Sequence, residues 1–180
     1  RYFEIRSAPE IVEDLELVHR FLRLQISSDQ KALEPIIGWR DELDRACTTV
    51  KVCTWDRARL FSLITGALSA AGINILTARI FTRTDNIALD TFHVTDARTG
   101  GFPTPDQRQL FEQILTRLLL GETVDLRALI ARHRRLRPLY QGYAGESIPT
   151  QIRFDNESSD THTLIEIETE DRVGLLYDVA

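Results

Sequence analysis

The fold is decided by residues 48–96, which read TTVKVCTWDRARLFSLITGALSAAGINILTARIFTRTDNIALDTFHVTD. Val50 and Val52 belong to a short β-favouring run that ends at Asp56. A helix with one buried face is predicted after the turn 56–59, because apolar residues recur there at helical spacing. These residues are Leu60, Leu63, Ile64, Ala67, Leu68 and Ala71.

Gly72 is expected to end this helix, since a glycine in the left-handed conformation satisfies the last carbonyls of a helix. Two runs rich in β-branched residues follow, at 73–83 and 87–95. They are separated by residues 84–86 (Thr-Asp-Asn), which are residue types that tolerate a hairpin turn. The stretch therefore predicts a β-α-β-β unit.

The composition is that of an ordinary globular chain, with 180 residues, 43% of them hydrophobic and 27% charged. This length suits one large domain or two small ones. A net charge of -5 argues against nucleic-acid binding, which usually shows a basic face. No apolar run approaches the ~20 residues of a membrane span, and charges throughout residues 1–20 argue against a signal peptide. Cys47 and Cys53 make no disulfide framework or zinc site and are expected to be thiols of a cytoplasmic protein.

Both ends of the chain favour a fragment of something larger. The chain starts at Arg1, contains no methionine and stops at Ala180 inside a predicted helix. An amphipathic helix is expected from Pro9. We assign residues 1–46 to the helical tail of a preceding domain and a connector, with a strand near residues 35–39.

Downstream of the central unit, Thr104 and Pro105 predict a helix start that Gly121 later ends. A second helix is expected from Thr123 to the basic stretch Arg132–Arg137. Such a stretch could contact an acidic partner or nucleic acid. A solvated helix end, favoured by the helix dipole, is the preferred interpretation.

Two later runs are predicted as strands. Residues 151–154 are expected to close the first unit as β-α-β-β-α-β, a ferredoxin-like α+β sandwich with an antiparallel sheet and helices on one face. Residues 163–169 alternate strongly and begin another unit. The resulting division is a first module at 47–156, with a long connection after its second helix, and the start of a second module at 157–180.

An internal repeat argues for tandem modules. Residues 48–57 (TTVKVCTWDR) align with residues 163–172 (TLIEIETEDR). The match continues from residues 58–61 (ARLF) into residues 173–176 (VGLL). The second copy begins 115 residues after the first.

The motifs DRARLF, AGINILTARIFT and ALDTFHV, together with a second DRVGLLYDVA, resemble the ACT domain family. More narrowly, they resemble the tandem ACT region at the C-terminus of the bifunctional uridylyltransferase/uridylyl-removing enzymes, which modify the PII signalling protein. The resemblance covers residues 48–96 and 150–180, and more loosely residues 1–30.

This resemblance implies a regulatory region and no catalysis in the fragment itself. In such enzymes, a nucleotidyltransferase domain adds uridylyl groups, an HD-type domain removes them, and the ACT pair senses glutamine. Mg²⁺ is the expected cofactor of the parent enzyme, and none is expected here. The four histidines are scattered without metal-ligand spacing; they are His19, His93, His133 and His162. The implied partners are glutamine and PII through the parent enzyme, with no nucleic acid and no membrane. A second ACT module, through self-association, is a further partner that the resemblance allows.

ACT modules usually bind small amino acids between the strand–helix turn of one module and the second strand of a partner. The turn presents backbone N–H groups to an α-carboxylate, and Asp56 or Asp171 can accept a hydrogen bond from a ligand ammonium. Gly174 permits close backbone approach, and Asn74 could recognise a ligand amide. The candidate ligand-binding residues are Asp171, Arg172, Gly174, Asp56, Arg57, Gly72 and Asn74.

Structural interpretations of these residues stay open: the aspartates as helix caps, Asn74 as a turn residue and the arginines as solvated charges. The first module also departs from the family pattern, because Ala58-Arg59 stands where relatives carry Pro-Gly. We therefore hypothesise that the second module's loop, with Gly174, holds the better site, either alone or completed by the first module. The rival functions are a ligand-free pairing or dimerisation module and a stand-alone ACT-repeat regulator.

Overall fold

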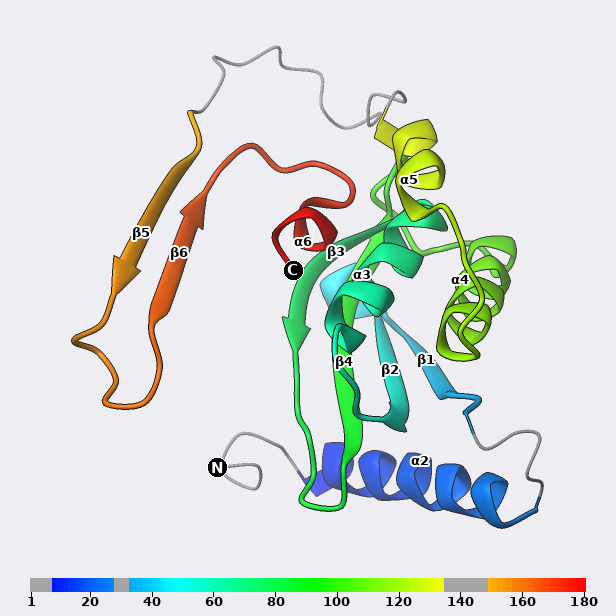
Figure 1. Cartoon of the computed structure of the whole chain (residues 1–180). Helices are drawn as coiled ribbons and strands as arrows, with labels where there is room; N and C mark the ends of the chain where they lie inside the picture. The colour runs from blue at the N-terminus through cyan, green and yellow to red at the C-terminus, as the bar shows by residue number, and fades with distance from the viewer. Residues whose placement is uncertain (1–7, 28–32, 135–148) are drawn as a thin grey trace.

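The computed structural model describes residues 8–27, 33–134 and 149–180. Its largest sheet is four-stranded and antiparallel, with the strand order β1-β2-β4-β3 (Figure 1). The strands of this sheet are β1 (Ile36–Glu42), β2 (Cys47–Trp55), β3 (Ile73–Arg79) and β4 (Ile87–Asp96). Residues 135–137 of the predicted basic stretch lie outside the described residues.

The predicted β-α-β-β unit is confirmed by β2, α3 (Leu60–Ala70), β3 and β4. Gly72 has the expected left-handed backbone, with a φ of 75°, directly after α3. Asn86 takes the same conformation, with a φ of 60°, in the hairpin turn, where asparagine tolerates it. β3 ends at Arg79, earlier than predicted, and Thr82 beyond it forms an isolated bridge to β4.

One face of the sheet is covered by α3, α4 (Pro105–Leu119) and α5 (Leu126–Arg134). Even-numbered residues of β2 and β4 point to this face because side chains alternate along a strand. They join the helices in one buried cluster that includes Val50, Val52, Ile64, Leu68, Phe92, Phe111 and Leu115. Each fully buried apolar side chain of this size stabilises the fold by roughly 1.5–3 kcal/mol, so this cluster is the main core.

The ends of α4 and α5 follow the sequence signals to different degrees. The predicted capping box is present at the start of α4, where the Thr104 hydroxyl accepts from the N–H of Gln107 and the Gln107 side-chain oxygen accepts from the N–H of Thr104. α5 begins at Leu126, later than the predicted Thr123.

The opposite face is covered at one end by α2 (Ala8–Ser27), the helix predicted from Pro9. Odd-numbered residues of β2 and β4 point there, and they form a second buried cluster with α2. Its members are Leu17, Val18, Phe21, Cys53, Ile87 and Leu89. The helices predicted for the module, α3, α4 and α5, lie on one face as predicted. By contrast α2, which the sequence analysis assigned to the tail of a preceding domain, packs on the other face of the same sheet. The reason is that β2 is buried along almost its whole length, and a strand buried on both faces requires cover on both sides.

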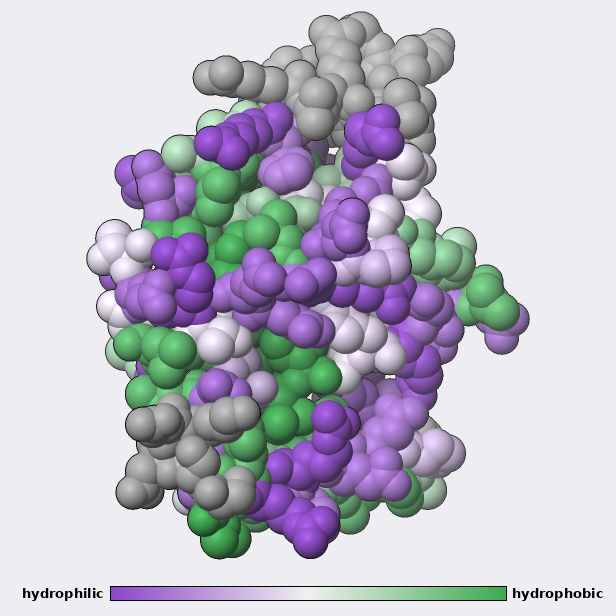
Figure 2. Space-filling view, turned by 90° about the vertical axis from the view of Figure 1, so that its right-hand side faces the viewer, coloured by the Kyte–Doolittle hydropathy of each residue, from purple (hydrophilic) through white to green (hydrophobic). Residues whose placement is uncertain are grey.

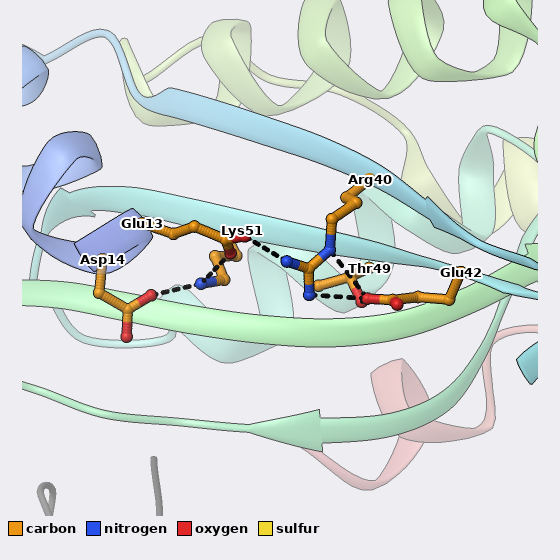
Figure 3. Close-up of polar contacts among 6 residues, drawn as sticks. All are labelled: Glu13, Asp14, Arg40, Glu42, Thr49 and Lys51. Carbon is orange, nitrogen blue, oxygen red and sulfur yellow. Dashed lines mark hydrogen bonds and ion pairs between the residues drawn. The ribbon is translucent and has the colours of Figure 1, made fainter. Parts of the chain in front are cut away.

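A buried ion pair fixes α2 on the sheet. Lys51 Nζ lies 2.6 Å from Asp14 Oδ1 and 2.9 Å from Glu13 Oε2. The side chains of Lys51 and Asp14 are only 6% and 2% exposed. Arg40 extends the network by binding Glu13 and Glu42, and Figure 3 shows these side chains lying along the sheet next to α2. Charges at this depth require their partners, so the network specifies where α2 sits on the sheet.

β5 (Gln151–Asp155) and β6 (Leu164–Glu168) form a separate antiparallel pair. The prediction that residues 151–154 close the first sheet is wrong, because β1 occupies the edge beside β2 and β5 pairs with β6. An alternating run identifies a strand and its two faces, but it does not identify the neighbouring strand.

The β5–β6 hairpin repeats the pairing of β1 with β2. Ile37 lies opposite Val52, and Ile152 lies opposite Ile167. Each residue of the second pair follows its counterpart by 115 positions. The same offset relates a second set of pairs. Trp39 lies opposite Val50 in the first hairpin, and Phe154 lies opposite Ile165 in the second. The structural repeat therefore includes the strand before the Asp-Arg motif.

We call residues 36–134 the first repeat and residues 151–180 the second repeat. In the first repeat these four apolar positions face the helices of the main core. In the second repeat the equivalent side chains are between 42% and 67% exposed; they are Ile152, Phe154, Ile165 and Ile167. The hairpin thus presents to solvent the face that is core in the first repeat.

The side of the molecule that carries α4 and β1 is mixed in character. Figure 2 shows hydrophilic residues in a band across this side, with hydrophobic residues visible above and below it. Within the three described ranges, no helix combines the length and the apolar character that crossing a membrane requires.

Asp90 is a buried carboxyl group on β4, only 1% exposed. Its Oδ1 accepts a hydrogen bond from the N–H of Phe81 at 3.2 Å. Burial raises the pKa of Asp90 to about 7, and the nearby charge of Asp56 acts in the same direction.

The variant Lys51→Met should lower the free energy of unfolding by about 3 kcal/mol, because it leaves the buried carboxylate of Asp14 without the Lys51 ammonium. The double variant Lys51→Met/Asp14→Leu should recover most of this loss, since apolar side chains often replace a buried pair at little cost. Urea unfolding, monitored by circular dichroism, measures the free energy of unfolding of both variants. A double variant as unstable as the single one would contradict this account.

The raised pKa of Asp90 predicts that stability falls as pH rises. The folded state holds this proton more tightly than the unfolded chain, whose aspartate pKa is near 3.8. The stabilising contribution is therefore complete below the unfolded pKa and is lost as pH rises through about 7. Asp90→Asn should remove most of this pH dependence and gain up to ~4 kcal/mol at about pH 8. Thermal melts from about pH 5 to 8 measure this pH dependence, and the exposed Asp85→Asn serves as the control. If Asp90→Asn kept the pH profile of the unsubstituted protein, the role of Asp90 would be refuted.

Candidate functional site

The sequence repeat is reproduced in the backbone of the two strand–helix turns. The N–H of Leu60 donates to the C=O of Arg57 at 3.2 Å at the start of α3. At the start of α6 (Leu175–Val179), the N–H of Leu175 donates to the C=O of Arg172 at 3.0 Å. The two turns therefore have the same hydrogen-bond pattern at equivalent positions.

The residues that precede the two helices both have left-handed backbone. Arg59 caps α3 with a φ of 66°, and Gly174 caps α6 with a φ of 80°. Neither cap has a side-chain hydrogen bond, so the alternative in which Asp56 and Asp171 are the helix caps is wrong. This conformation is easy for glycine and strained for a residue with a Cβ. The first turn thus stores strain that the second turn avoids.

Four of the seven candidate residues lie together. Asn74 at the start of β3 and Asp171, Arg172 and Gly174 of the second repeat line one cleft of about 210 Å³. The remaining lining residues are Ser69, Ile75, Leu76, Leu175 and Leu176. Asn74 is only 8% exposed. The cleft has one wall from each repeat, as the hypothesis of a second-module site completed by the first module requires, and ligand binding there stays a prediction.

The other three candidate residues lie outside this cleft, and each makes a contact that supports the fold. Arg57 Nη1 donates to the last carbonyl of α4 at 2.8 Å, so its interpretation as a solvated charge is wrong. The C=O of Gly72 accepts from Gln107 Nε2 at 2.9 Å. The N–H of Asp56 donates to the C=O of Asn86 at 2.7 Å, which fixes the end of β2.

Two glycines allow the second repeat to lie against the first. A Cβ on Gly174 would come within 2.7 Å of Ile130 and 3.0 Å of Arg134, both on α5. A Cβ on Gly66 of α3 would come within 2.7 Å of the Tyr177 ring. Gly174 therefore serves the contact with α5 as well as the left-handed turn, and a substitution there changes more than the space for a ligand.

Arg134 at the end of α5 is a residue that the sequence analysis missed. Its Nε donates to the C=O of Val173 at 2.8 Å, and its Nη2 lies 2.6 Å from Asp178 Oδ2 and 3.4 Å from the C=O of Gly174. Arg172 binds the same oxygen of Asp178. Arg134 and Arg172 remain partly exposed, at 33% and 46% of their side chains, as the interpretation of solvated charges expected, but both also bind Asp178.

The described residues give little support to metal or thiol chemistry. Among them, no three His, Cys, Asp or Glu side chains are grouped as a metal site would need. His133 Nε2 lies 3.1 Å from the C=O of Ala70, a contact between α5 and α3. Cys47 and Cys53 are free and buried, and burial raises the pKa of Cys53 to about 12. A thiol with so high a pKa is a poor nucleophile near neutral pH.

Comparison with known proteins finds relatives for most of the chain. An enzyme from Azospirillum brasilense is 38% identical over 144 residues, which are 79% of this chain and 15% of that protein. One from Ruegeria pomeroyi is 35% identical over 158 residues, 88% of this chain and 17% of that protein. One from Nitrobacter winogradskyi is 32% identical over 171 residues, 92% of this chain and 17% of that protein. All three are bifunctional uridylyltransferase/uridylyl-removing enzymes. This chain is homologous to one region of these enzymes.

The resemblance to the uridylyltransferase/uridylyl-removing enzymes that the motifs indicated is thus confirmed. The chain spans only 15% to 17% of the length of these three relatives. No family model matches the chain, and no solved structure matches it. The α+β architecture with antiparallel strands is established by the structure, whereas the ACT assignment rests on the sequence motifs.

Arg59→Gly should raise the free energy of unfolding by roughly 0.5–1 kcal/mol, because glycine relieves the left-handed strain before α3 and part of the gain is offset by the freer unfolded chain. Arg59→Ala keeps the Cβ and removes the charge, so it is the matched control and should bring no comparable gain. Denaturant unfolding compares the two. Equal stability of the glycine and alanine variants would show that this strain is negligible.

Proposed function

We propose that this chain is the amino-acid-sensing region, built from ACT modules, of a cytoplasmic uridylyltransferase/uridylyl-removing enzyme, and that glutamine is its ligand. The bound ligand controls the uridylylation and deuridylylation of PII by catalytic domains elsewhere in the enzyme, which use Mg²⁺. The region itself performs no catalysis. The observation that carries this proposal is that Asn74, Asp171 and Arg172, from two repeats, line one cleft in a chain homologous to these enzymes.

The groups in the cleft suit a free amino acid. The Arg172 guanidinium can bind an α-carboxylate through charge-assisted hydrogen bonds, and the Asp171 carboxylate can accept from an α-ammonium. The amide of Asn74 can both donate to and accept from the side-chain amide of glutamine. The volume of about 210 Å³ is below the ~300 Å³ at which sites for drug-sized ligands begin, which favours a small ligand.

Control of distant domains requires that glutamine bind one arrangement of the repeats more tightly than another. The cleft meets this requirement, because separation of the second repeat from β3 would remove Asp171 and Arg172 from Asn74. A ligand that contacts both walls therefore stabilises the docked arrangement. A difference of ~1–3 kcal/mol between the two arrangements is enough for useful regulation.

A ligand-free pairing module is the second candidate, and the contacts between the repeats favour it. Tyr177 lies over Gly66, and Gly174 lies against Ile130, so the repeats pack closely without any ligand. In this case the repeats would hold the parent enzyme together or dimerise it. A stand-alone regulator is distinguished from both by the length of the coding region upstream of Arg1.

Calorimetric titration of L-glutamine into the protein tests the sensing function. We expect binding that is selective over glutamate and leucine. Asn74→Ala should weaken it by about 5–10-fold, the effect of one lost hydrogen bond. Asn156→Ala, in the turn between β5 and β6, is the matched control and should bind glutamine as the unsubstituted protein does.

Two results would reject the sensing function at this cleft. The first is an absence of heat with all three amino acids, which together with concentration-dependent association would favour the pairing module. The second is glutamine binding that Asn74→Ala and Asn156→Ala affect equally, which would place the ligand elsewhere.

A further inference from the structure

Asp178 of α6 is held by one arginine from each repeat. Arg134, the last residue of α5, binds its Oδ2 at 2.6 Å, and Arg172 binds the same oxygen. Arg172 also lines the cleft. A side chain in the cleft wall is therefore joined, through one carboxylate, to a helix of the first repeat.

Arg134 also holds the backbone of the cleft wall. It donates to the C=O of Val173 at 2.8 Å and reaches the C=O of Gly174 at 3.4 Å. Arginine suits this role because its donors lie in a rigid planar fork that serves several acceptors at once, whereas lysine carries one compact charge. The side chain is 33% exposed, so its directed bonds to two carbonyls matter more than its charge, which solvent screens.

We propose that Arg134 is the positioning residue of the cleft, and that occupancy of the cleft and docking of the second repeat on α5 are coupled through it. Arg134 touches no ligand in this scheme. It fixes residues 172–178 so that Asp171 and Arg172 face Asn74 across the cleft. Ligand binding and docking of the second repeat are two coupled equilibria, and such coupling is reciprocal. A ligand that bridges the cleft therefore strengthens the contacts of Arg134, and loss of Arg134 lowers the affinity for the ligand. The coupling to ligand rests on the proposed function, whereas the positioning does not.

Hydrogen exchange measured by mass spectrometry on the ligand-free protein tests the positioning. The reporters are the amides of Leu175 and Asp178, which bond to the carbonyls of Arg172 and Gly174 in the turn of α6. Arg134→Gln should speed their exchange by ~5–10-fold, since local opening becomes easier. The matched control is Arg117→Gln, which removes an exposed ion pair with Glu122 at the end of α4 and should leave these amides unchanged.

Titration with L-glutamine tests the coupling on the same variants. Arg134→Gln should bind glutamine about 10-fold more weakly than the unsubstituted protein does, whereas the affinity of Arg117→Gln should be unchanged. Arg134→Lys should recover only part of the affinity, because lysine can pair with Asp178 but cannot also reproduce the fork to the carbonyls. Glutamine should slow exchange at Leu175 and Asp178 in the parent protein and less so in Arg134→Gln.

The outcomes separate the two parts of the proposal. Equal exchange in Arg134→Gln and Arg117→Gln would overturn the positioning role. Faster exchange in Arg134→Gln with unchanged glutamine affinity would overturn the coupling. If the parent protein binds no glutamine, the proposed function and the coupling both fail, while the exchange experiment still decides the positioning role by itself.

Discussion

The burial of β2 on both faces is the constraint on which the rest of the structure depends. Its even-numbered residues, such as Val50 and Val52, form the main core with α3, α4 and α5. Its odd-numbered residues need separate cover, and Cys53 obtains it from α2. Lys51 lies on that second face, where its burial obliges it to pair with Asp14. A single central strand thus determines why α2 is part of this fold and where it sits.

The contacts between the repeats give the cleft its composition. Left-handed backbone at equivalent positions leads the chain into α3 and α6 in the same way. Only the second turn has glycine there, at a position where an added Cβ would meet α5. Gly174 lies against Ile130, and Arg134 then holds the carbonyls and carboxylate that follow. Because these contacts and the cleft share Arg172 and Gly174, packing between the repeats and the geometry of the site cannot vary independently.

Sequence reasoning succeeded where the signal was local. The stripe from Leu60, the stop at Gly72 and the capping box at Thr104 each depend on residues within a turn or two, and all three are present. It failed where a residue meets a partner far along the chain. Arg134 contacts residues about 40 positions away, and no periodicity reports such a distance. The pairing of β5 did leave a signal: Ile152 and Phe154 follow Ile37 and Trp39 at the offset of the repeat, so extending the repeat towards the N-terminus would have placed β5 beside β6.

The solvent-exposed apolar face of the β5–β6 hairpin has a consequence for the handling of this polypeptide. Two strands alone are marginally stable in water, and each has one edge whose backbone groups lie outside the pairing of β5 with β6. An exposed edge next to exposed Ile152, Phe154, Ile165 and Ile167 is a template for intermolecular β-pairing. The hairpin is therefore where aggregation of these 180 residues should nucleate, and where a lysine or proline on an edge strand would most improve solubility.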